Sequence, residues 1–302
     1  MLSHIVSRTL AAALAFSACA CYAQAVPGSR VEARHYLWEV VSMTNRAYLF
    51  GTIHAGRKEM YPLPAAVEQA FADSEVLVVE ADITDLAAMS RGTDGMSYAP
   101  PDELRKHVPP DDYKRFLAQL ARFGVAEESV KQLKPFTAIS LLMFGEWARL
   151  GYEPGLGIDG YLLKKAKAAK KPVVELEGVA EQAKLVDSLT EEEHRTIFGS
   201  TLTALESGLT GEQMEGMVKA WSVGDSFLML EIARRYNEKV PGARALEDKF
   251  IWSRHDAMLE KIEGYLNKSK QKHFIAVGSL HLAGPKGLVQ MLRSRGYVVR
   301  QR

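Results

Sequence analysis

Short apolar runs alternate with longer helical segments along most of the chain, and this alternation constrains the fold more than any other feature. The run Val76–Val79 is apolar throughout, which is typical of a strand covered on both faces. Segments 36–41 and 47–54 are rich in aromatic and β-branched residues around a turn-like stretch, so they predict a hairpin. Further strands are expected at 172–177, 274–280 and 297–300. The sequence therefore predicts an α/β fold with a central mixed β-sheet flanked by helices.

Helical periodicity occupies the segments between these strands. The expected helical segments are 64–71, about 100–150, 157–171, 179–268 and 285–295. Gly208–Gly211 and Pro241–Gly242 are expected to interrupt the longest of them. No linker-like tract rich in Pro, Gly or Ser divides the chain, so residues 26–302 are predicted to form one α/β domain. Its helical subregion, about 100–150 and 179–268, is interpreted as a large insertion or cap.

The first 25 residues predict a signal peptide. Arg8 supplies a positive charge, residues 9–16 form a small apolar run, and Ala23-Gln-Ala25 is a small-x-small cleavage pattern. Both cysteines of the chain, Cys19 and Cys21, fall inside this segment. Cleavage after Ala25 would leave no thiol nucleophile and no thiolate metal ligand. We therefore expect a periplasmic or secreted protein, with a lipoprotein acylated at one of the two cysteines as the alternative.

Composition and charge narrow the classes of partner. The chain is 47% hydrophobic and 25% charged, which is ordinary for a globular protein. Its 38 Lys and Arg balance 37 Asp and Glu, so the formal net charge of +1 gives no electrostatic argument for nucleic acid or an anionic membrane. After the N-terminal segment, no apolar run reaches the length of a transmembrane helix, and we expect no membrane span. The oligomeric state cannot be inferred from these features.

Two segments far apart in the chain share one pattern. In Gly51-Thr-Ile-His54 and in Gly278-Ser-Leu-His281, an apolar strand is followed by glycine, a hydroxyl residue, an aliphatic residue and histidine. Glycine near a strand end lets a ligand or another backbone approach closely. Ligands of open α/β sheets bind outside the carboxyl ends of the strands, where both histidines are expected. Paired imidazoles suit metal ligation or acid–base catalysis.

Carboxylates occupy comparable strand-end positions. Glu80 follows the apolar strand Val76–Val79 directly and is the main acidic candidate. Glu177, at the end of the strand expected at 172–177, is a second candidate. Asp159 stands where the helix after Gly157 begins, and helix capping is its default interpretation.

Arg254 interrupts an apolar stripe. Leu246, Phe250, Met258 and Ile262 follow a four-residue spacing, and Arg254 occupies the missing step. An arginine in such a position extends its head to solvent, pairs with a carboxylate, or contacts a ligand. Since acidic residues are already candidates, pairing or stabilisation of an oxyanion is expected alongside the solvent-directed alternative.

Together these motifs resemble the TraB/GumN family, which is related to the Tiki metalloproteases. The resemblance is carried by Tyr48–His54, Tyr61–Pro64, Val76–Glu80, Gly157–Asp159 and Val277–Pro285. It implies an α/β fold whose centre is formed by His54, His281 and Glu80. Tiki-type members are manganese- or cobalt-dependent peptidases that act outside the cytoplasm. Arg254 matches a late-helix arginine of the family, whereas His255 stands where many members have asparagine.

The sequence therefore predicts an exported metal-dependent hydrolase, most simply a peptidase acting on a peptide or protein substrate. His54, Glu80 and His281 are the expected ligands of Mn or Co, with Zn as a further option, and Arg254 is the expected oxyanion partner. Glu80 could instead be the general base. The alternatives are a metal-independent esterase and a non-enzymatic protein that binds haem or a peptide, since the wider group also resembles erythromycin esterases and a haem-binding lipoprotein.

Overall fold

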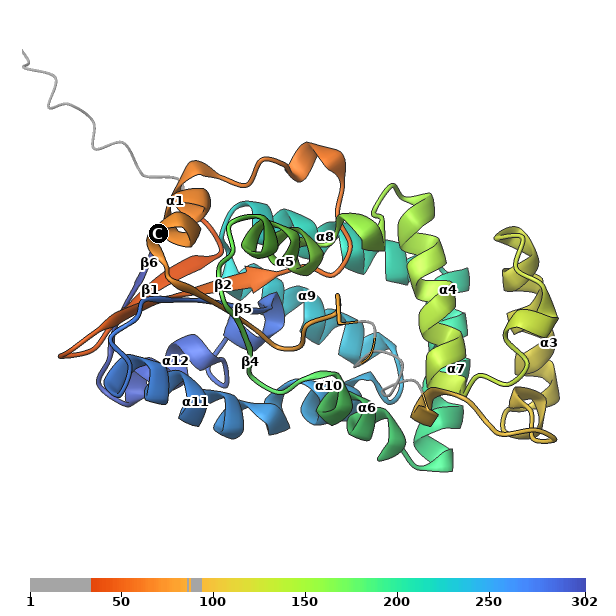
Figure 1. Cartoon of the computed structure of the whole chain (residues 1–302). Coiled ribbons are helices and arrows are strands. Elements are labelled where there is room, and N and C mark those ends of the chain that lie inside the picture. The colour runs from red at the N-terminus through yellow and green to blue at the C-terminus, as the bar shows by residue number, and fades with distance from the viewer. Residues whose placement is uncertain (1–33, 86, 88–93) are drawn as a thin grey trace, which may run out of the picture. The chain divides into compact units, whose positions relative to one another are not determined.

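The protein, represented by a computed structural model, is described for residues 34–85, 87 and 94–302 (Figure 1). The predicted signal peptide and both cysteines lie outside the described residues. Within them, one sheet has six strands in the order β4-β3-β5-β2-β1-β6. The strands are β1 Leu37–Val41, β2 Arg46–Thr52, β3 Val76–Val79, β4 Val173–Glu175, β5 His273–Gly278 and β6 Val298–Gln301.

The sheet is mixed, as the sequence predicts. The hairpin strands β1 and β2 pair antiparallel, and β6 pairs antiparallel with β1. The other neighbours, β2 with β5, β5 with β3 and β3 with β4, all pair parallel. Val76–Val79 is fully buried, in agreement with its continuous apolar run. Four consecutive parallel strands therefore direct their carboxyl ends to one edge of the sheet.

Helices flank the sheet and extend beyond it. The α-helices with complete description are α1 Ala65–Asp73, α3 Pro110–Arg122, α4 Pro135–Arg149, α5 Ile158–Ala168, α6 Val179–Asp187, α7 Glu191–Glu206, α8 Leu209–Ser222, α9 Ser226–Lys239, α10 Ala243–Phe250, α11 His255–Asn267 and α12 Leu288–Ser294. Figure 1 shows α1 and α5 on one side of the sheet and α11 and α12 on the other, with α3, α4 and α7 away from it. The predicted α/β fold flanked by helices is confirmed. No helix among the described residues is long and apolar enough to cross a membrane.

The long helical region 179–268 contains more breaks than the sequence analysis predicts. Gly208 and Gly242 do precede helices, both with positive φ. Additional helix starts occur at Thr190, which forms a capping box with Glu193, and at Asp225, whose carboxylate accepts two backbone N–H groups of α9. Side-chain N-caps thus begin new helices where no proline is present.

A further break separates α10 from α11 and corrects the interpretation of the apolar stripe. Residues Trp252–Arg254 form a 3-10 turn, so Arg254 lies before the first residue of α11 rather than within one helix. Leu246 and Phe250 pack against a hydrophobic core built from α3, α4 and α7. Met258 and Ile262 belong to the larger core around the sheet. The two halves of the stripe therefore pack into two different hydrophobic cores, and Arg254 lies in the sequence between the two halves.

Candidate functional site

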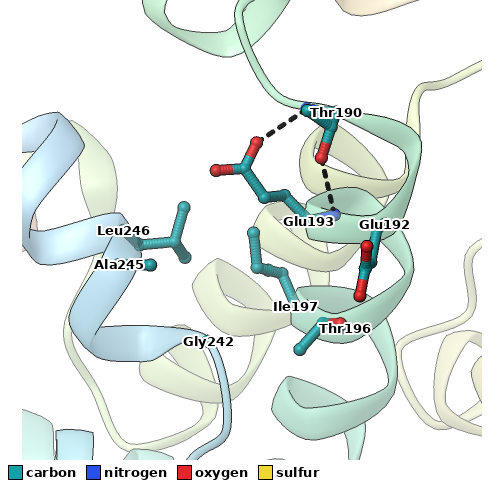
Figure 2. A pocket seen from close by; sticks show the side chains of 8 residues that line it. All are labelled: Thr190, Glu192, Glu193, Thr196, Ile197, Gly242, Ala245 and Leu246. Carbon is teal, nitrogen blue, oxygen red and sulfur yellow. Dashed lines mark hydrogen bonds between the residues drawn. The ribbon is translucent and has the colours of Figure 1, made fainter.

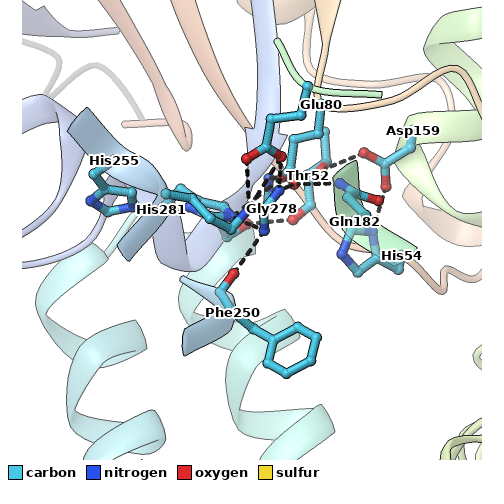
Figure 3. A network of polar contacts seen from close by, with 12 residues as sticks. Thr52, His54, Glu80, Asp159, Gln182, Phe250, His255, Gly278 and His281 are labelled. Atoms are coloured by element: carbon cyan, nitrogen blue, oxygen red, sulfur yellow. Dashed lines mark hydrogen bonds and ion pairs between the residues drawn. The ribbon is translucent and has the colours of Figure 1, made fainter. Parts of the chain in front are cut away.

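The carboxyl ends of four neighbouring strands bring the predicted site residues together. In the parallel register, Thr52 of β2 lies opposite Gly278 of β5, and Val79 of β3 lies opposite Ala276. His54 and His281 follow β2 and β5, Glu80 follows β3, and Glu177 follows β4. The backbone N–H of Glu177 donates to the carbonyl of Glu80 at 3.0 Å, which keeps these two acidic residues side by side. Figure 3 shows the resulting network around Gly278.

His54 is held by an aspartate from the start of α5. Its Nδ1 lies 2.9 Å from Oδ2 of Asp159, while Thr52 Oγ1 donates to Oδ1 of the same carboxylate at 2.7 Å. The His54 side chain is 64% exposed, so the imidazole faces solvent on its other side. The Asp159 carboxylate is the largest influence on this ring and raises the pKa of His54 to about 9. His54 is therefore cationic at neutral pH.

Glu80 is a buried acceptor at the centre of the network. Its Oε1 accepts from the backbone N–H of Gly278 at 2.6 Å, and its Oε2 accepts from Gln182 at 3.2 Å and from Arg254 at 2.5 Å. Burial acts to raise the pKa of Glu80, but protonated His281, Arg254, His54 and the Gly278 N–H together lower it to about 2. His281 contributes only in acid, because burial lowers the pKa of that imidazole to about 3. When His281 is neutral, Arg254, His54 and the Gly278 N–H still hold the pKa of Glu80 below its ordinary value.

Arg254 uses all five of its N–H groups within the site. Nε donates to Glu177 at 2.9 Å, and Nη2 donates to both Glu177 and Glu80. Nη1 donates to the Phe250 carbonyl at 2.7 Å and lies 3.2 Å from Nε2 of His281. A guanidinium has five N–H donors and no acceptor. Arg254 is thus a largely buried cation between two carboxylates and an imidazole, and each of its N–H groups has a partner.

His281 lies at the centre of a second chain of contacts. Its Nδ1 is 2.9 Å from Nε2 of His255, and Nδ1 of His255 is 2.7 Å from the carbonyl oxygen of Lys286. Both rings are only 2% exposed. His281 Nε2, on the opposite side of its ring, lies 3.6 Å from Oε1 of Glu80.

The two glycines of the repeated motif serve different purposes. A Cβ built on Gly51 would lie 2.3 Å from the Tyr36 ring, so this glycine makes room for core packing. A Cβ built on Gly278 would lie 3.4 Å from Oε1 of Glu80, 3.5 Å from Cδ2 of His281 and 3.8 Å from Nε2 of His54. The missing side chain of Gly278 therefore leaves a hollow that both histidines and the glutamate face.

The donor types around this hollow fit a divalent cation. Two imidazole nitrogens and a carboxylate are ligands that Mn²⁺, Co²⁺ and Zn²⁺ accept. However, among the residues that the structure describes, no three His, Cys, Asp or Glu side chains converge closely enough to hold a metal ion. Arg254 instead lies against His281 Nε2 and Glu80. The donor types therefore suit a divalent cation, but in this structure the Arg254 guanidinium is the cation that lies against them.

Sequence reasoning did not assign three members of this network. Asp159 does not cap α5, because the N-cap is Gly157 and Asp159 bonds to Thr52 and His54 instead. Its only sequence signal was its place in Gly157-Ile-Asp159. The sequence analysis predicts no role for Gln182 or His255, because their contacts with Glu80 and His281 join segments far apart in the chain.

A cavity among the described residues lies away from this network. It measures about 170 Å³ and is bordered by α7 and α10, with Thr190, Glu193 and Leu246 among its lining residues (Figure 2). Glu193 and Thr190 bond to each other there as a helix cap. None of the predicted site residues lines it, so this cavity belongs to the packing of the helical region.

The fold and site define an α/β protein with a polar centre of histidine, carboxylate and arginine at the carboxyl ends of parallel strands. The chain belongs to the TraB/PrgY/gumN family, whose sequence profile matches residues 36–301. The match covers all four strand ends that carry the site.

Individual relatives are distant. Uncharacterized protein YbaP of Escherichia coli is 26% identical over 267 residues, which cover 86% of this chain and 94% of YbaP. Metalloprotease TIKI2 of Xenopus tropicalis is 24% identical over 330 residues, covering 91% of this chain but 61% of TIKI2. Metalloprotease TIKI1 of Homo sapiens is 22% identical, with 89% and 62% covered. The chain thus spans about three fifths of these two metalloproteases. No solved structure matches significantly.

Proposed function

We propose that this chain is a hydrolase of peptide or protein substrates that uses a divalent cation, Mn or Co, with Zn as the alternative. Relatives named as metalloproteases support the reaction class. The observation that carries the proposal is the hollow beside Gly278, which His54 Nε2, Glu80 Oε1 and the His281 ring all face. When bound there, a divalent cation lowers the pKa of coordinated water and polarises a carbonyl group.

The electrostatics of Glu80 support a ligand role over a general-base role. A general base works best with a pKa near the operating pH. The pKa of Glu80 is lowered to about 2, with burial opposed by nearby positive charge and the Gly278 N–H. A carboxylate so strongly ionised accepts a proton poorly but remains an anionic ligand across the physiological range.

For the site to function, His54 must lose a proton and Arg254 must change partner. His54 has to release its Nε2 proton before it can serve as a ligand, and Asp159 then keeps Nδ1 protonated and the ring oriented. Arg254 has no spare N–H while it donates to His281. Once the His281 lone pair is used elsewhere, one N–H of Nη1 becomes available to a developing oxyanion.

The proposal places the protein outside the cytoplasm, either in the periplasm or secreted. Its support is the order of positive charge, apolar run and small-x-small pattern in the first 25 residues. N-terminal sequencing of the protein after expression in a bacterial host, with fractionation of the cells, tests this part independently of activity.

Bound metal and peptide cleavage test the proposed chemistry. The purified protein is loaded with Mn, Co or Zn, analysed for bound metal, and incubated with a peptide library followed by mass spectrometry. The same measurements are made on His54→Ala and His281→Ala. The control is His107→Ala, a histidine of the helical region that contacts Asp102 and Glu191 instead of the site.

The outcomes separate the candidate functions. Stoichiometric metal and cleavage in wild type and control, with both lost in the two site variants, support the proposal. Cleavage that survives chelation would replace it with a metal-independent hydrolase. Absence of cleavage together with a Soret shift on haem titration, lost in His281→Ala, would replace it with a haem-binding protein.

A further inference from the structure

A continuous line of hydrogen bonds runs from a backbone carbonyl to the centre of the site. It begins at the carbonyl oxygen of Lys286, passes through Nδ1 and Nε2 of His255, and reaches Nδ1 of His281. Beyond that ring, Nε2 of His281 meets Nη1 of Arg254 at 3.2 Å. Each end of this line has only one chemical role available to it.

The Lys286 end fixes the proton on His255. A carbonyl oxygen only accepts hydrogen bonds, so Nδ1 of His255 carries a hydrogen and donates it. In the neutral ring the other nitrogen, Nε2, is then an acceptor. Burial lowers the pKa of His255, in agreement with a neutral ring. His255 Nε2 therefore accepts from Nδ1–H of His281.

The Arg254 end leads independently to the same assignment. A guanidinium nitrogen only donates, so Nε2 of His281 must present its lone pair to Nη1 of Arg254. With Nε2 unprotonated, the neutral His281 ring carries its hydrogen on Nδ1, facing His255. Two separate groups, a backbone carbonyl acting through His255 and a guanidinium, thus favour one and the same tautomer.

We infer that His255 is a positioning residue that fixes His281 as its Nδ1–H tautomer and keeps the Nε2 lone pair on the side of the ring that meets Arg254 and Glu80. Because both rings are 2% exposed, solvent does not readily replace this bond. Histidines that act as ligands commonly donate their second ring N–H to an oriented acceptor, which sets tautomer and direction. The inference rests on the proposed function only for the use made of that lone pair.

Two substitutions at position 255 form a matched pair. In His255→Gln, the amide lies about where Nε2 lies in histidine, so its oxygen can accept from His281. In His255→Asn, the amide lies about where Nδ1 lies, so it can donate to Lys286 but does not reach His281. Both place a polar amide at the first position of α11, where Asn has a helix propensity close to that of His and Gln a higher one, and circular dichroism checks that each variant is folded.

The readout is the state of each ring nitrogen of His281 in long-range ¹H–¹⁵N correlation spectra of the metal-free full chain. Wild type and His255→Gln are expected to show a protonated Nδ1 and an unprotonated Nε2. In His255→Asn, Nδ1–H of His281 loses its acceptor and only Arg254 still favours an unprotonated Nε2, so we expect a mixture of the two tautomers. A protonated Nε2 in wild type, or an unchanged tautomer in His255→Asn, would overturn the inference.

Titration with Mn²⁺ or Co²⁺ provides a second measurement. Changes to groups that orient ligands typically weaken metal affinity by about 10–100-fold, and we expect this loss in His255→Asn but not in His255→Gln. Equal affinities in both variants would overturn the link between tautomer and ligation. If none of the three proteins binds metal, the metal part of the proposed function fails, while the spectra still decide the positioning role.

Discussion

Nη1 of Arg254 lies 3.2 Å from Nε2 of His281, so the arginine donates to the atom that the site would need as a ligand. The same guanidinium is tied to Glu177 and Glu80. The site is thus held together by a cation of the protein itself, the Arg254 guanidinium. The Nε2 lone pair of His281 accepts one partner at a time, and in this structure that partner is Arg254. Under the proposed function, an external cation that binds His281 Nε2 would displace this arginine N–H.

Removing that internal cation should destabilise the protein. Arg254→Met leaves Glu80 and Glu177 buried without their partner, and breaking a buried pair typically costs about 3–5 kcal/mol. Urea unfolding with a chelator present measures the loss. The control Arg234→Met removes an exposed pair with Glu238 and should change stability by less than about 0.5 kcal/mol. Similar effects in the two variants would contradict the central role of Arg254.

Filling the hollow should weaken metal binding without unfolding the chain. Gly278 has φ of −50°, which alanine adopts without strain, and its new Cβ would meet site atoms at 3.4–3.8 Å. For Gly278→Ala we expect stability within about 1 kcal/mol of wild type and metal affinity lowered roughly 10–100-fold. Gly264→Ala, in open space on α11, is the control and should be slightly more stable with unchanged affinity. A metal affinity equal to that of wild type in Gly278→Ala would show that the metal binds elsewhere.

Asp159 should control the charge of His54. Its carboxylate is the main reason that the pKa of His54 is raised to about 9. In Asp159→Asn this pKa should fall toward the ordinary value of 6.5, as followed by NMR titration of the ring without metal. Asp73→Asn, which alters a surface carboxylate of α1 bonded to Gln69, should leave it unchanged. An unchanged pKa of His54 in Asp159→Asn would refute the pairing of His54 with Asp159.

Stability should decrease in acid before most carboxylates titrate. Burial lowers the pKa of His281 from 6.5 to about 3, so between these values the unfolded chain binds a proton that the folded chain does not. This contribution is complete above pH 6.5 and is lost as pH falls toward 3. The pKa of Glu80, lowered from 4.5 to about 2, adds a second loss below pH 4.5.

The His281 contribution can be isolated by substitution. Urea unfolding between pH 7 and pH 4, with chelator, should give a flatter profile for His281→Gln than for wild type. The difference in slope is at most about 1.4 kcal/mol per pH unit, the value for one proton. Gly264→Ala should retain the wild-type slope. Parallel profiles for wild type and His281→Gln would show that this imidazole is not held neutral.

Much of the fold was predictable because its signals are local. The continuous apolar run Val76–Val79 and the hairpin at 36–54 follow from side-chain type and period alone, and both strand assignments are confirmed. The break between α10 and α11 was not predicted, because residues 251–254 contain neither glycine nor proline. There the chain changes from one hydrophobic core to another, which a single periodic stripe does not reveal.

The site was predictable only in part, for a similar reason. A strand-end position can be read from sequence, and this placed His54, Glu80, Glu177 and His281 at one edge. The partner of each side chain depends on tertiary contacts instead. Asp159 reaches His54 across 105 positions of sequence, and His255 reaches the carbonyl of Lys286 across 31. Backbone acceptors carry no residue-type signal, so the orienting bonds became visible only in three dimensions.

The location of Arg254 between two hydrophobic cores has a consequence for partial unfolding. Phe250, whose carbonyl accepts from Arg254, packs with the helical core, while Met258 packs with the sheet core. A form that opened only the helical core would keep both histidines on the intact sheet and lose the anchor of the arginine. The integrity of the site therefore depends on the packing of both cores, and a partially unfolded form that kept the sheet intact would already lack it.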